Sequence, residues 1–285
     1  MARSVTVIIV TYNSAAVIAD CLGSIPDDLE VLVVDNASTD ESLALVQARA
    51  INHPNIRLIR HKLNQGFGRA NNTGLKECAT DYALLLNPDA RLTEGVVDRL
   101  LALSRDLEHP FLSPELTFSE KPSLPVEQQR VVSTDFVLGA FLLGRMDVWR
   151  KTGFFDENIF MYGEDNELCQ RILACGHSIV RVEGLYAHHI GGTNVDPSIP
   201  YLKFRHEYMA KGSAYKHMHI NGRDKKWLRR KIKNYIFKLI LATLIFDRRG
   251  RVTHFAKIKG SLDYYQRGKD SLLPDWLAEG QSTEV

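Results

Sequence analysis

The first half of the chain alternates short apolar runs with stretches whose apolar residues recur at helical spacing. Four runs rich in aliphatic residues predict buried strands, at Val5–Val10, Glu30–Val34, Asn55–Arg60 and Tyr82–Leu86. Helical patterns follow them, over Asn13–Gly23, Ser38–Ala50, Phe67–Cys78 and Thr93–Ser104. Strands that alternate with helices form parallel sheets with right-handed crossovers. The pattern therefore predicts an α/β fold, with helices on both faces of a mostly parallel sheet.

The pattern becomes less regular after this point. Residues 110–130 contain four prolines among mixed polar residues, which predict an irregular connection. Strand-like apolar runs follow at Asp135–Leu143 and Ser178–Val182, and a helical pattern covers Glu164–Cys175.

From Tyr201 on, the sequence is helical and basic. Residues 200–285 contain 19 Lys and Arg against 8 Asp and Glu, whereas residues 1–199 contain 17 against 26. We expect one domain over residues 1–200 and a basic, mainly helical extension over residues 201–285. An acidic body can hold a metal ion, and a basic extension can bind phosphate, nucleic acid or anionic lipid.

Composition narrows the class of protein. With 285 residues, 45% hydrophobic and 25% charged, the chain has the profile of a soluble globular protein rather than a disordered or fibrous one. Its apolar runs are too short to span a membrane, and Val5–Val10 lacks the features of a signal peptide. Four cysteines show neither a C-x-x-C pair nor zinc spacing, so we expect reduced, packed thiols in a cytoplasmic protein.

Polar residues stand just past the predicted strands, where ligands bind in parallel α/β sheets. Any one of them can be a turn or helix-cap residue, but together they follow consecutive strand ends. They are Thr11, Tyr12 and Asn13, then Asp35 and Asn36, Asn64 to Gly68, Asn87 to Asp89, and His188 with His189.

Within this set, Asp35 can accept hydrogen bonds from a ribose or a base edge. A G-x-G-x-x-G sequence after the first strand and a Walker A sequence are both absent, which argues against a dehydrogenase and a P-loop kinase. Asp89 can bind a hard divalent cation, and Asn87 can add a neutral oxygen. His188 or His189 can complete a metal site with Asp89.

The densest acidic cluster of the body is Tyr162–Glu167. Carboxylates in the first turn of a helix are stabilised by its dipole, so a structural role is one interpretation. The other is a general base at the edge of the sheet, near an acceptor hydroxyl.

The segment Tyr235–Phe246 is strongly apolar and lies between Arg229–Lys233 and Arg248–Arg251. It is too short to cross a bilayer. It fits a helix that lies in the interface of an anionic membrane, through residues 225–260. The alternative is a helix packed on the first domain or on a second subunit; nucleic-acid binding is the weakest of the three interpretations.

Seven segments, in this order, resemble those of glycosyltransferase family 2, whose members are inverting enzymes of the GT-A fold. The resemblance is greatest to the bacterial branch that includes rhamnosyltransferases, and it covers roughly residues 4–193. The segments are Val10–Asn13, Val34–Asp40, Asn64–Gly74, Leu86–Asp89, Gly139–Arg145, Gly153–Glu157 and Tyr162–Asp165.

The resemblance implies roles for single residues. Thr11 and Asn13 would line the nucleotide site, with Asp35 on the base or ribose. Three others would lie near the nucleotide or its diphosphate: Asn64, Gly66 and Arg69.

The same resemblance makes Asp89 the metal-binding acid of a D-x-D-like position, in which Asn87 replaces the first Asp. Asp165, paired with Glu164, would be the catalytic base. His188 corresponds to a later His of the family that is proposed as a metal ligand, and the resemblance does not decide between His188 and its neighbour His189 for this role.

We therefore expect an enzyme that uses Mg²⁺ or Mn²⁺ and moves a sugar from a nucleoside diphosphate donor to a lipid-linked or growing surface glycan. The resemblance favours dTDP-rhamnose as donor. Two alternatives stay open: an inert sugar-nucleotide-binding scaffold, and a nucleotidyltransferase. The latter would carry a basic glycine-rich loop in place of Thr11–Asn13.

Overall fold

The computed structural model describes residues 4–106, 109–119, 121–191, 198–275 and 277. They form two compact units. The first comprises described residues within Met1–Phe155 and Leu168–Asn194, and the second those within Asp156–Glu167 and Val195–Val285. The boundary that the sequence suggested after residue 200 falls inside a helix of the second unit. No described helix is long and apolar enough to cross a membrane.

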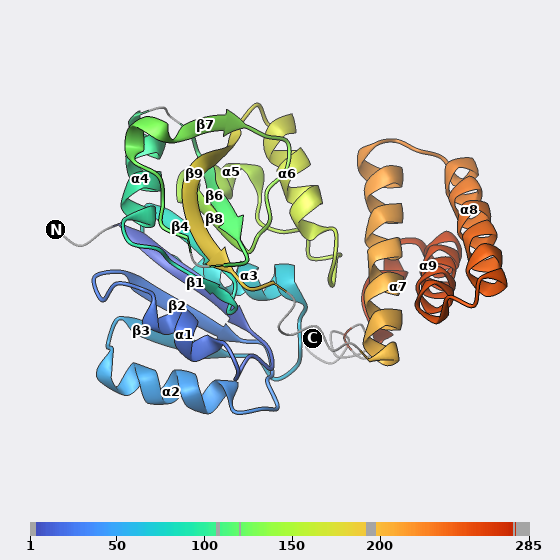
Figure 1. The fold of residues 1–285 in the computed structure, drawn as a ribbon, viewed down its shortest axis with the longest axis horizontal. Helices are drawn as coiled ribbons and strands as arrows, with labels where there is room; N and C mark the ends of the chain where they lie inside the picture. Colours follow the sequence, from blue (N-terminus) through green and yellow to red (C-terminus); the bar gives the residue numbers. More distant parts are fainter. Residues whose placement is uncertain (1–3, 107–108, 120, 192–197, 276, 278–285) are drawn as a thin grey trace, which may run out of the picture. The chain divides into compact units, whose positions relative to one another are not determined.

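The first unit is built on a mixed sheet in the order β3-β2-β1-β4-β8-β6-β9-β5, with β7 paired to β9 (Figure 1). Strands β1 to β4 are mutually parallel where they pair. Strand β8 is antiparallel to its neighbours β4 and β6, while β6 and β9 are parallel. The strands are β1 (Val5–Thr11), β2 (Glu30–Asp35), β3 (Ile56–Arg60), β4 (Tyr82–Leu86), β5 (Ala90–Arg91), β6 (Phe111–Thr117), β7 (Arg130–Ser133), β8 (Phe141–Arg145) and β9 (Ile179–His189).

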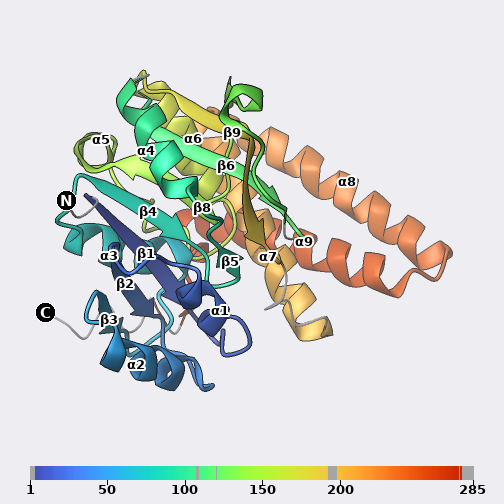
Figure 2. The same cartoon turned by 60° about the vertical axis from the view of Figure 1, so that its left-hand side comes forward.

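Helices cover both faces of this sheet, as the sequence predicted (Figure 2). Apolar residues of α1 (Ile18–Gly23), α2 (Ser42–Asn52) and α4 (Val96–Asp106) share one core with the sheet. The opposite core holds α3 (Phe67–Glu77), α5 (Met146–Thr152) and the later turns of α6 (Glu164–Ala174), around the fully buried Trp149. Burial of β-branched and aliphatic side chains on both faces explains why the strands are almost continuously apolar.

Two predictions for the middle of the chain are wrong. Residues 110–130 contain the central strand β6 and a short 3-10 helix, Val126–Gln128, rather than only an irregular connection. The register between β6 and β9 shifts at Pro114, and proline is tolerated in a strand at such an irregularity. The strand expected over Asp135–Leu143 is confined to Phe141–Arg145.

The second unit contains α7 (Ile199–Tyr215), a π turn (Lys216–Ile220), α8 (Lys225–Leu244), α9 (Arg248–Arg267) and a 3-10 turn (Gly268–Ser271). Helices α8 and α9 run side by side (Figures 1 and 2). The segment 156–167 packs on the helices of this unit. Ile159 lies in the core that holds Ala214 and Leu228, and Phe160 contacts Tyr208.

The four cysteines are free, and three of them are buried as expected. Cys175 is exposed, so the expectation of packed thiols is wrong for this residue. It follows α6 directly, one residue before the Gly176 that ends the helical pattern.

Gly74 allows α3 to pack closely on β1, and its replacement tests this contact. A Cβ at Gly74 would lie 2.4 Å from Cγ2 of the fully buried Ile8. We expect Gly74→Ala to lower the free energy of unfolding by about 1–3 kcal/mol, because overpacking outweighs the better helix propensity of alanine. Urea unfolding of the full chain measures this.

Gly23→Ala is the matched control, since nothing lies within 4 Å of the position of its Cβ. Equal stability of the two variants would contradict this account of the α3–β1 contact.

Candidate active site

The carboxyl ends of β1 and β2 place a hydroxyl and a carboxylate next to each other. Thr11 and Asp35 are partners in the parallel register, and both are fully buried. Thr11 Oγ1 and Asp35 Oδ1 have no hydrogen-bond partner among the described residues. Buried polar atoms without partners are costly, so two of them side by side at a strand end indicate a place for a polar ligand.

Hydrogen bonds tie the loop after β1 to the loop after β2. Asn13 has a φ of 50°, and its Oδ1 accepts the backbone N–H of Thr39 at 2.8 Å. Asp40 accepts the N–H groups of Ala15 and Ser42, each at 3.0 Å. These bonds fix the position of Asn13, while the neighbouring Tyr12 is exposed to solvent.

A second set of bonds ties the loop after β2 to the loop after β3. Asn36 donates to Asn64 Oδ1 at 2.9 Å and accepts the N–H of Gln65 at 2.8 Å. His61 Nδ1 lies 3.1 Å from Asn36 Oδ1. The pKa of His61 is lowered, because the effect of burial exceeds the opposing effect of nearby Asp35. Asn36 is among the edge residues predicted from the sequence, whereas His61 is not, although it directly follows a predicted strand.

The N-terminus of α3 points its first N–H groups toward this edge. Gly66, with a φ of 83°, precedes the helix, and its N–H donates to Asn64 Oδ1 at 2.9 Å. Arg69 is the third residue of α3. Because free N–H groups and the dipole favour anions at a helix N-terminus, a diphosphate fits this position.

The structure brings Asp89 and His189 together and turns His188 elsewhere. His189 Nε2 lies 3.2 Å from Asp89 Oδ1, and both side chains are mostly buried. His188 Nδ1 accepts from Arg91 Nε at 3.3 Å, and its Nε2 lies 3.0 Å from the carbonyl oxygen of Phe118. Both ring nitrogens of His188 are thus used within the protein.

Strand β5 creates this difference. Ala90 pairs with His189 and Arg91 with His188 in an antiparallel register, and adjacent residues of a strand point to opposite faces. Gly192 and Thr193, which end the segment of resemblance, lie outside the described residues.

Asp89 and His189 suit a divalent cation that a substrate also binds. Among the described residues, no group of three or more His, Cys, Asp or Glu can hold a metal ion. Mg²⁺ is commonly bound by one or two carboxylates plus substrate phosphates, so a site with a single carboxylate can serve it. Asn87 lies nearby in the chain, and its backbone oxygen accepts the N–H of Ala90 at 3.0 Å.

The second unit contains Glu164 and Asp165, which begin α6. The preceding turn has positive φ values at Tyr162 (66°) and Gly163 (118°). This turn lies on α7 at Gly212, where a Cβ would be 2.1 Å from the carbonyl oxygen of Tyr162. Tyr162 is held further by a 2.8 Å hydrogen bond to the hydroxyl of Tyr201, so α7 positions the turn that carries both acids.

Glu164 is buried, and its Oε2 has no hydrogen-bond partner among the described residues. Burial, and then the charge of Asp165, raise the pKa of Glu164 above its ordinary value. Two adjacent carboxyls whose environments differ in this way are typical of sites where one acid keeps its proton and the other loses it.

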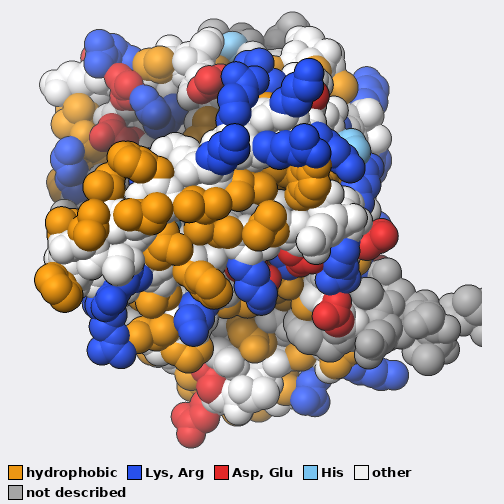
Figure 3. Space-filling view, turned by 90° about the vertical axis from the view of Figure 1, so that its right-hand side faces the viewer, with side chains coloured by type: hydrophobic (Ala, Val, Ile, Leu, Met, Phe, Trp, Pro, Cys, Tyr) orange, Lys and Arg blue, Asp and Glu red, His pale blue; other side chains and the backbone are white. Residues whose placement is uncertain are grey.

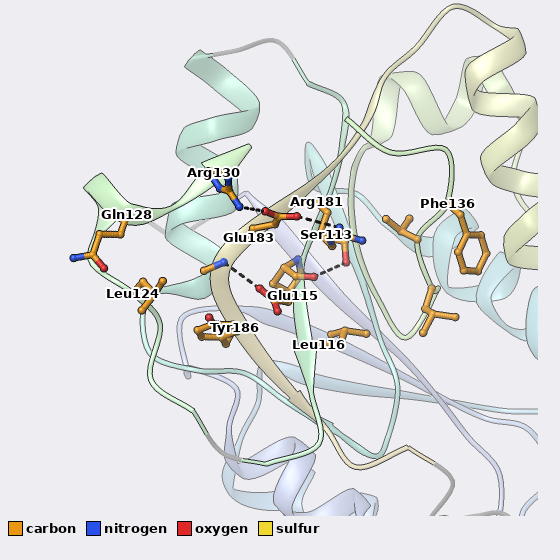
Figure 4. A pocket seen from close by; sticks show the side chains of 14 residues that line it. Ser113, Glu115, Leu116, Leu124, Gln128, Arg130, Phe136, Arg181, Glu183 and Tyr186 are labelled. Carbon is orange, nitrogen blue, oxygen red and sulfur yellow. Dashed lines mark hydrogen bonds and ion pairs between the residues drawn. The ribbon is translucent and has the colours of Figure 1, made fainter. Parts of the chain in front are cut away.

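A separate hollow of about 700 Å³ lies along β6 and β9 in the first unit (Figure 4). Glu183 bridges Arg130 and Arg181 there, and Glu115 accepts the N–H of Gly184 at 3.2 Å. Tyr186, on its wall, is two residues before His188 and three before His189, so it shares a face of β9 with His188 and not with His189.

Solved structures share this fold. The mannosyltransferase PcManGT from Pyrobaculum calidifontis, solved with GDP-Man and Mn²⁺, has a TM-score of 0.59 and 17% identity, and the match covers 99% of this chain and 76% of that one. TarS 1-349 from S. aureus has a TM-score of 0.56 and 16% identity, and the match covers 92% and 91%. The chain therefore has the GT-A fold of glycosyltransferases that act on nucleotide sugars.

The family model described as Glycosyl transferase family 2 matches residues 6–160, more than half of the chain, and the chain belongs to this family. It is 24% identical to the low-salt glycan biosynthesis hexosyltransferase Agl10 of Haloferax volcanii over 75% of this chain and 78% of that one.

It is 26% identical to the N-acetylglucosaminyl-diphospho-decaprenol L-rhamnosyltransferase of Mycobacterium tuberculosis, over 67% of this chain and 78% of that one. A pre-mycofactocin glycosyltransferase of the same species is 28% identical, but the match covers only 40% of its length. The family and GT-A fold expected from the sequence are thus confirmed; the roles of single residues stay predictions.

The raised pKa of Glu164 predicts how stability depends on pH. A carboxyl whose pKa is higher in the folded protein keeps its proton up to a higher pH there. The free energy of unfolding therefore falls as the pH rises from the pKa of the unfolded state through that of the folded state. One such group contributes at most about 1.4 kcal/mol per pH unit. We expect Glu164→Gln to flatten this fall in urea unfolding curves recorded between acid and mildly alkaline pH.

Glu127→Gln, at an exposed position, is the control and should keep the wild-type profile. A Glu164→Gln profile as steep as that of the wild type would contradict the assignment.

Proposed function

We propose that this glycosyltransferase moves rhamnose from dTDP-rhamnose to a lipid-linked or growing surface glycan, with inversion at the anomeric carbon. The adjacent buried oxygens of Thr11 and Asp35, which have no partner among the described residues, carry the proposal, because they leave a polar site where a nucleoside can bind. The rhamnosyltransferase relative supports this choice of donor and of a lipid-linked acceptor.

The tied loops at the edge of the sheet would hold the donor. Asp35 would accept hydrogen bonds from the base or ribose, and the hydroxyl of Thr11 would donate one, with Asn13 beside them. Asn64 and Gly66 shape the start of α3, and its N-terminus with Arg69 faces the diphosphate. These contacts orient the sugar by holding the part of the donor that does not react.

Asp89 and His189 would hold a Mg²⁺ or Mn²⁺ ion, as their 3.2 Å approach supports. When bound, the ion supplies a Lewis acid that offsets negative charge on the diphosphate. The hydrogen bonds of His188 to Arg91 and Phe118 favour His189 over His188 as the ligand.

Asp165 would act as the general base. It takes the proton of the acceptor hydroxyl while that oxygen forms a bond to the anomeric carbon. The bond from this carbon to the diphosphate breaks on the opposite side, so the configuration inverts and the nucleoside diphosphate leaves. Glu164, with its raised pKa, would keep its proton and leave Asp165 as the charged member of the pair.

The hollow beside β9 is our candidate for acceptor binding. It offers carboxylates, arginines and the partly exposed ring of Phe136, a mixture that suits a polar ligand with apolar faces.

The second candidate function is an inert scaffold that binds sugar nucleotides. The same buried oxygens of Thr11 and Asp35 would serve it. The two proposals differ in whether Asp165 matters for turnover.

Replacing the proposed base separates the two. We expect Asp165→Asn to bind dTDP-rhamnose with wild-type affinity by calorimetry and to release dTDP about 10²–10⁴-fold more slowly, because a positioned base contributes about that much. Near wild-type turnover in the variant would show that Asp165 is not the base. Donor binding without turnover in either protein, with glycan acceptors present, would favour the scaffold.

Replacing each histidine tests the metal assignment. We expect His189→Ala to raise the Mn²⁺ concentration needed for half-maximal binding at least about tenfold, since loss of even an outer-shell partner of a metal ligand typically costs about 10–100-fold in affinity. His188→Ala should bind Mn²⁺ nearly as well as the wild type and lose stability instead. Electron paramagnetic resonance of free Mn²⁺ measures the binding, and the reverse ranking would contradict the assignment.

A further inference from the structure

Helix α8 carries a row of exposed apolar side chains. Only Leu228, Ile232 and Ala242 are buried among its described residues. Large apolar residues at Ile236, Phe237, Ile240, Leu241 and Leu244 are exposed, and this spacing puts them on one side of the helix. Leu244 is 68% exposed, and the bend after it adds Ile245 at 72% and Phe246 at 85%.

We call these seven residues, Ile236, Phe237, Ile240, Leu241, Leu244, Ile245 and Phe246, the apolar row. Figure 3 shows a field of hydrophobic side chains on this side of α8, with Lys and Arg along its border. Monomeric soluble proteins rarely expose contiguous apolar areas of this kind without a binding role.

A capping turn at the end of α8 places the last residues of the row. Phe246 has a φ of 57°, and its N–H donates to the carbonyl oxygen of Thr243 while that of Asp247 donates to the carbonyl oxygen of Ala242, a pattern that commonly ends helices. The turn leaves the ring of Phe246 85% exposed.

The charge around the row identifies the chemistry of that partner. Residues 225–262 contain twelve Lys and Arg and a single acid, Asp247. Asp247 caps α9 by accepting the N–H of Gly250 at 2.9 Å. Basic residues stand at both ends of the row, with Arg230 and Lys233 before it and Arg248 and Arg249 after it.

We propose that the apolar row enters the surface of an anionic lipid bilayer, with the flanking Lys and Arg on the lipid phosphates. Apolar side chains gain from leaving water for the acyl region, and each basic residue near an anionic surface adds about 1 kcal/mol, roughly a fivefold gain in affinity. Helix α8 would then lie along the bilayer surface.

Other occupants fit less well. In a two-fold symmetric contact with a second copy, a basic border of one copy would face a basic border of the other, and the like charges would repel. A nucleic acid would meet the basic residues but leave the apolar row in water. Residues 278–285 contain only Ala278 and Val285 as aliphatic residues, too few to cover the row.

Flotation of the full chain with vesicles tests the proposal. We expect the wild type to float with vesicles of phosphatidylcholine and phosphatidylglycerol, much less with phosphatidylcholine alone, and less at high salt. The variant Phe237→Ser/Ile240→Ser/Leu244→Ser/Phe246→Ser should bind at least about tenfold more weakly. Arg230→Gln/Lys233→Gln/Arg248→Gln/Arg249→Gln should lose the preference for anionic vesicles.

Ile51→Ser is the matched control, since Ile51 is a large apolar residue, 81% exposed, on α2 of the first unit. It should float as the wild type does. A fluorescence readout that does not depend on the serine variants is Phe246→Trp, whose emission should shift to the blue when anionic vesicles are added.

Three results would overturn the proposal. The wild type fails to float, the serine variant floats as well as the wild type, or light scattering shows a dimer that the serine variant abolishes in protein that does not float. None depends on the donor sugar, so the proposed function stands or falls separately.

Discussion

The parallel pairing of β1 with β2 is the constraint on which the candidate site depends. It aligns Thr11 with Asp35 at the same edge of the sheet. One side-chain oxygen of each is buried without a hydrogen-bond partner among the described residues, which costs free energy unless a ligand supplies the hydrogen bond. Backbone N–H groups donate to the side-chain oxygens of Asn13, Asn36 and Asp40 and so fix the loops beyond the strands. The edge is therefore organised before any donor binds.

The chain after residue 198 has a structural role beyond its basic charge. Helix α7 supports the turn before Glu164 and Asp165, through the close approach at Gly212 and the hydrogen bond between Tyr162 and Tyr201. The proposed base is therefore built on the same unit as α8, whose apolar row we assign to a membrane surface. Binding to lipid and positioning of the base would thus belong to one folded unit.

Much of the first half of the fold could be predicted, because its strands are buried on both faces and read as unbroken apolar runs. Strand β6 was missed since Pro114, which normally excludes a strand, lies at a register shift. The second half of β9 was missed because Glu183 and Gly184, directly after Val182, interrupt its apolar pattern.

The candidate site could be predicted only in part. The rule that ligands bind past strand ends identified Asp35, Asp89 and the histidine pair. It did not separate His188 from His189, because their directions depend on pairing with β5, a strand of two residues. Nor could it reveal α7 beneath Tyr162, since a contact so distant in the chain leaves no local pattern.

A crystal structure of the full chain grown with dTDP and Mn²⁺ would test the account most directly. The account predicts the nucleoside against Thr11 and Asp35, the diphosphate at the N-terminus of α3, and the ion bound to Asp89 and His189. A nucleotide bound at another edge of the sheet, or an ion held by His188 in place of His189, would contradict it.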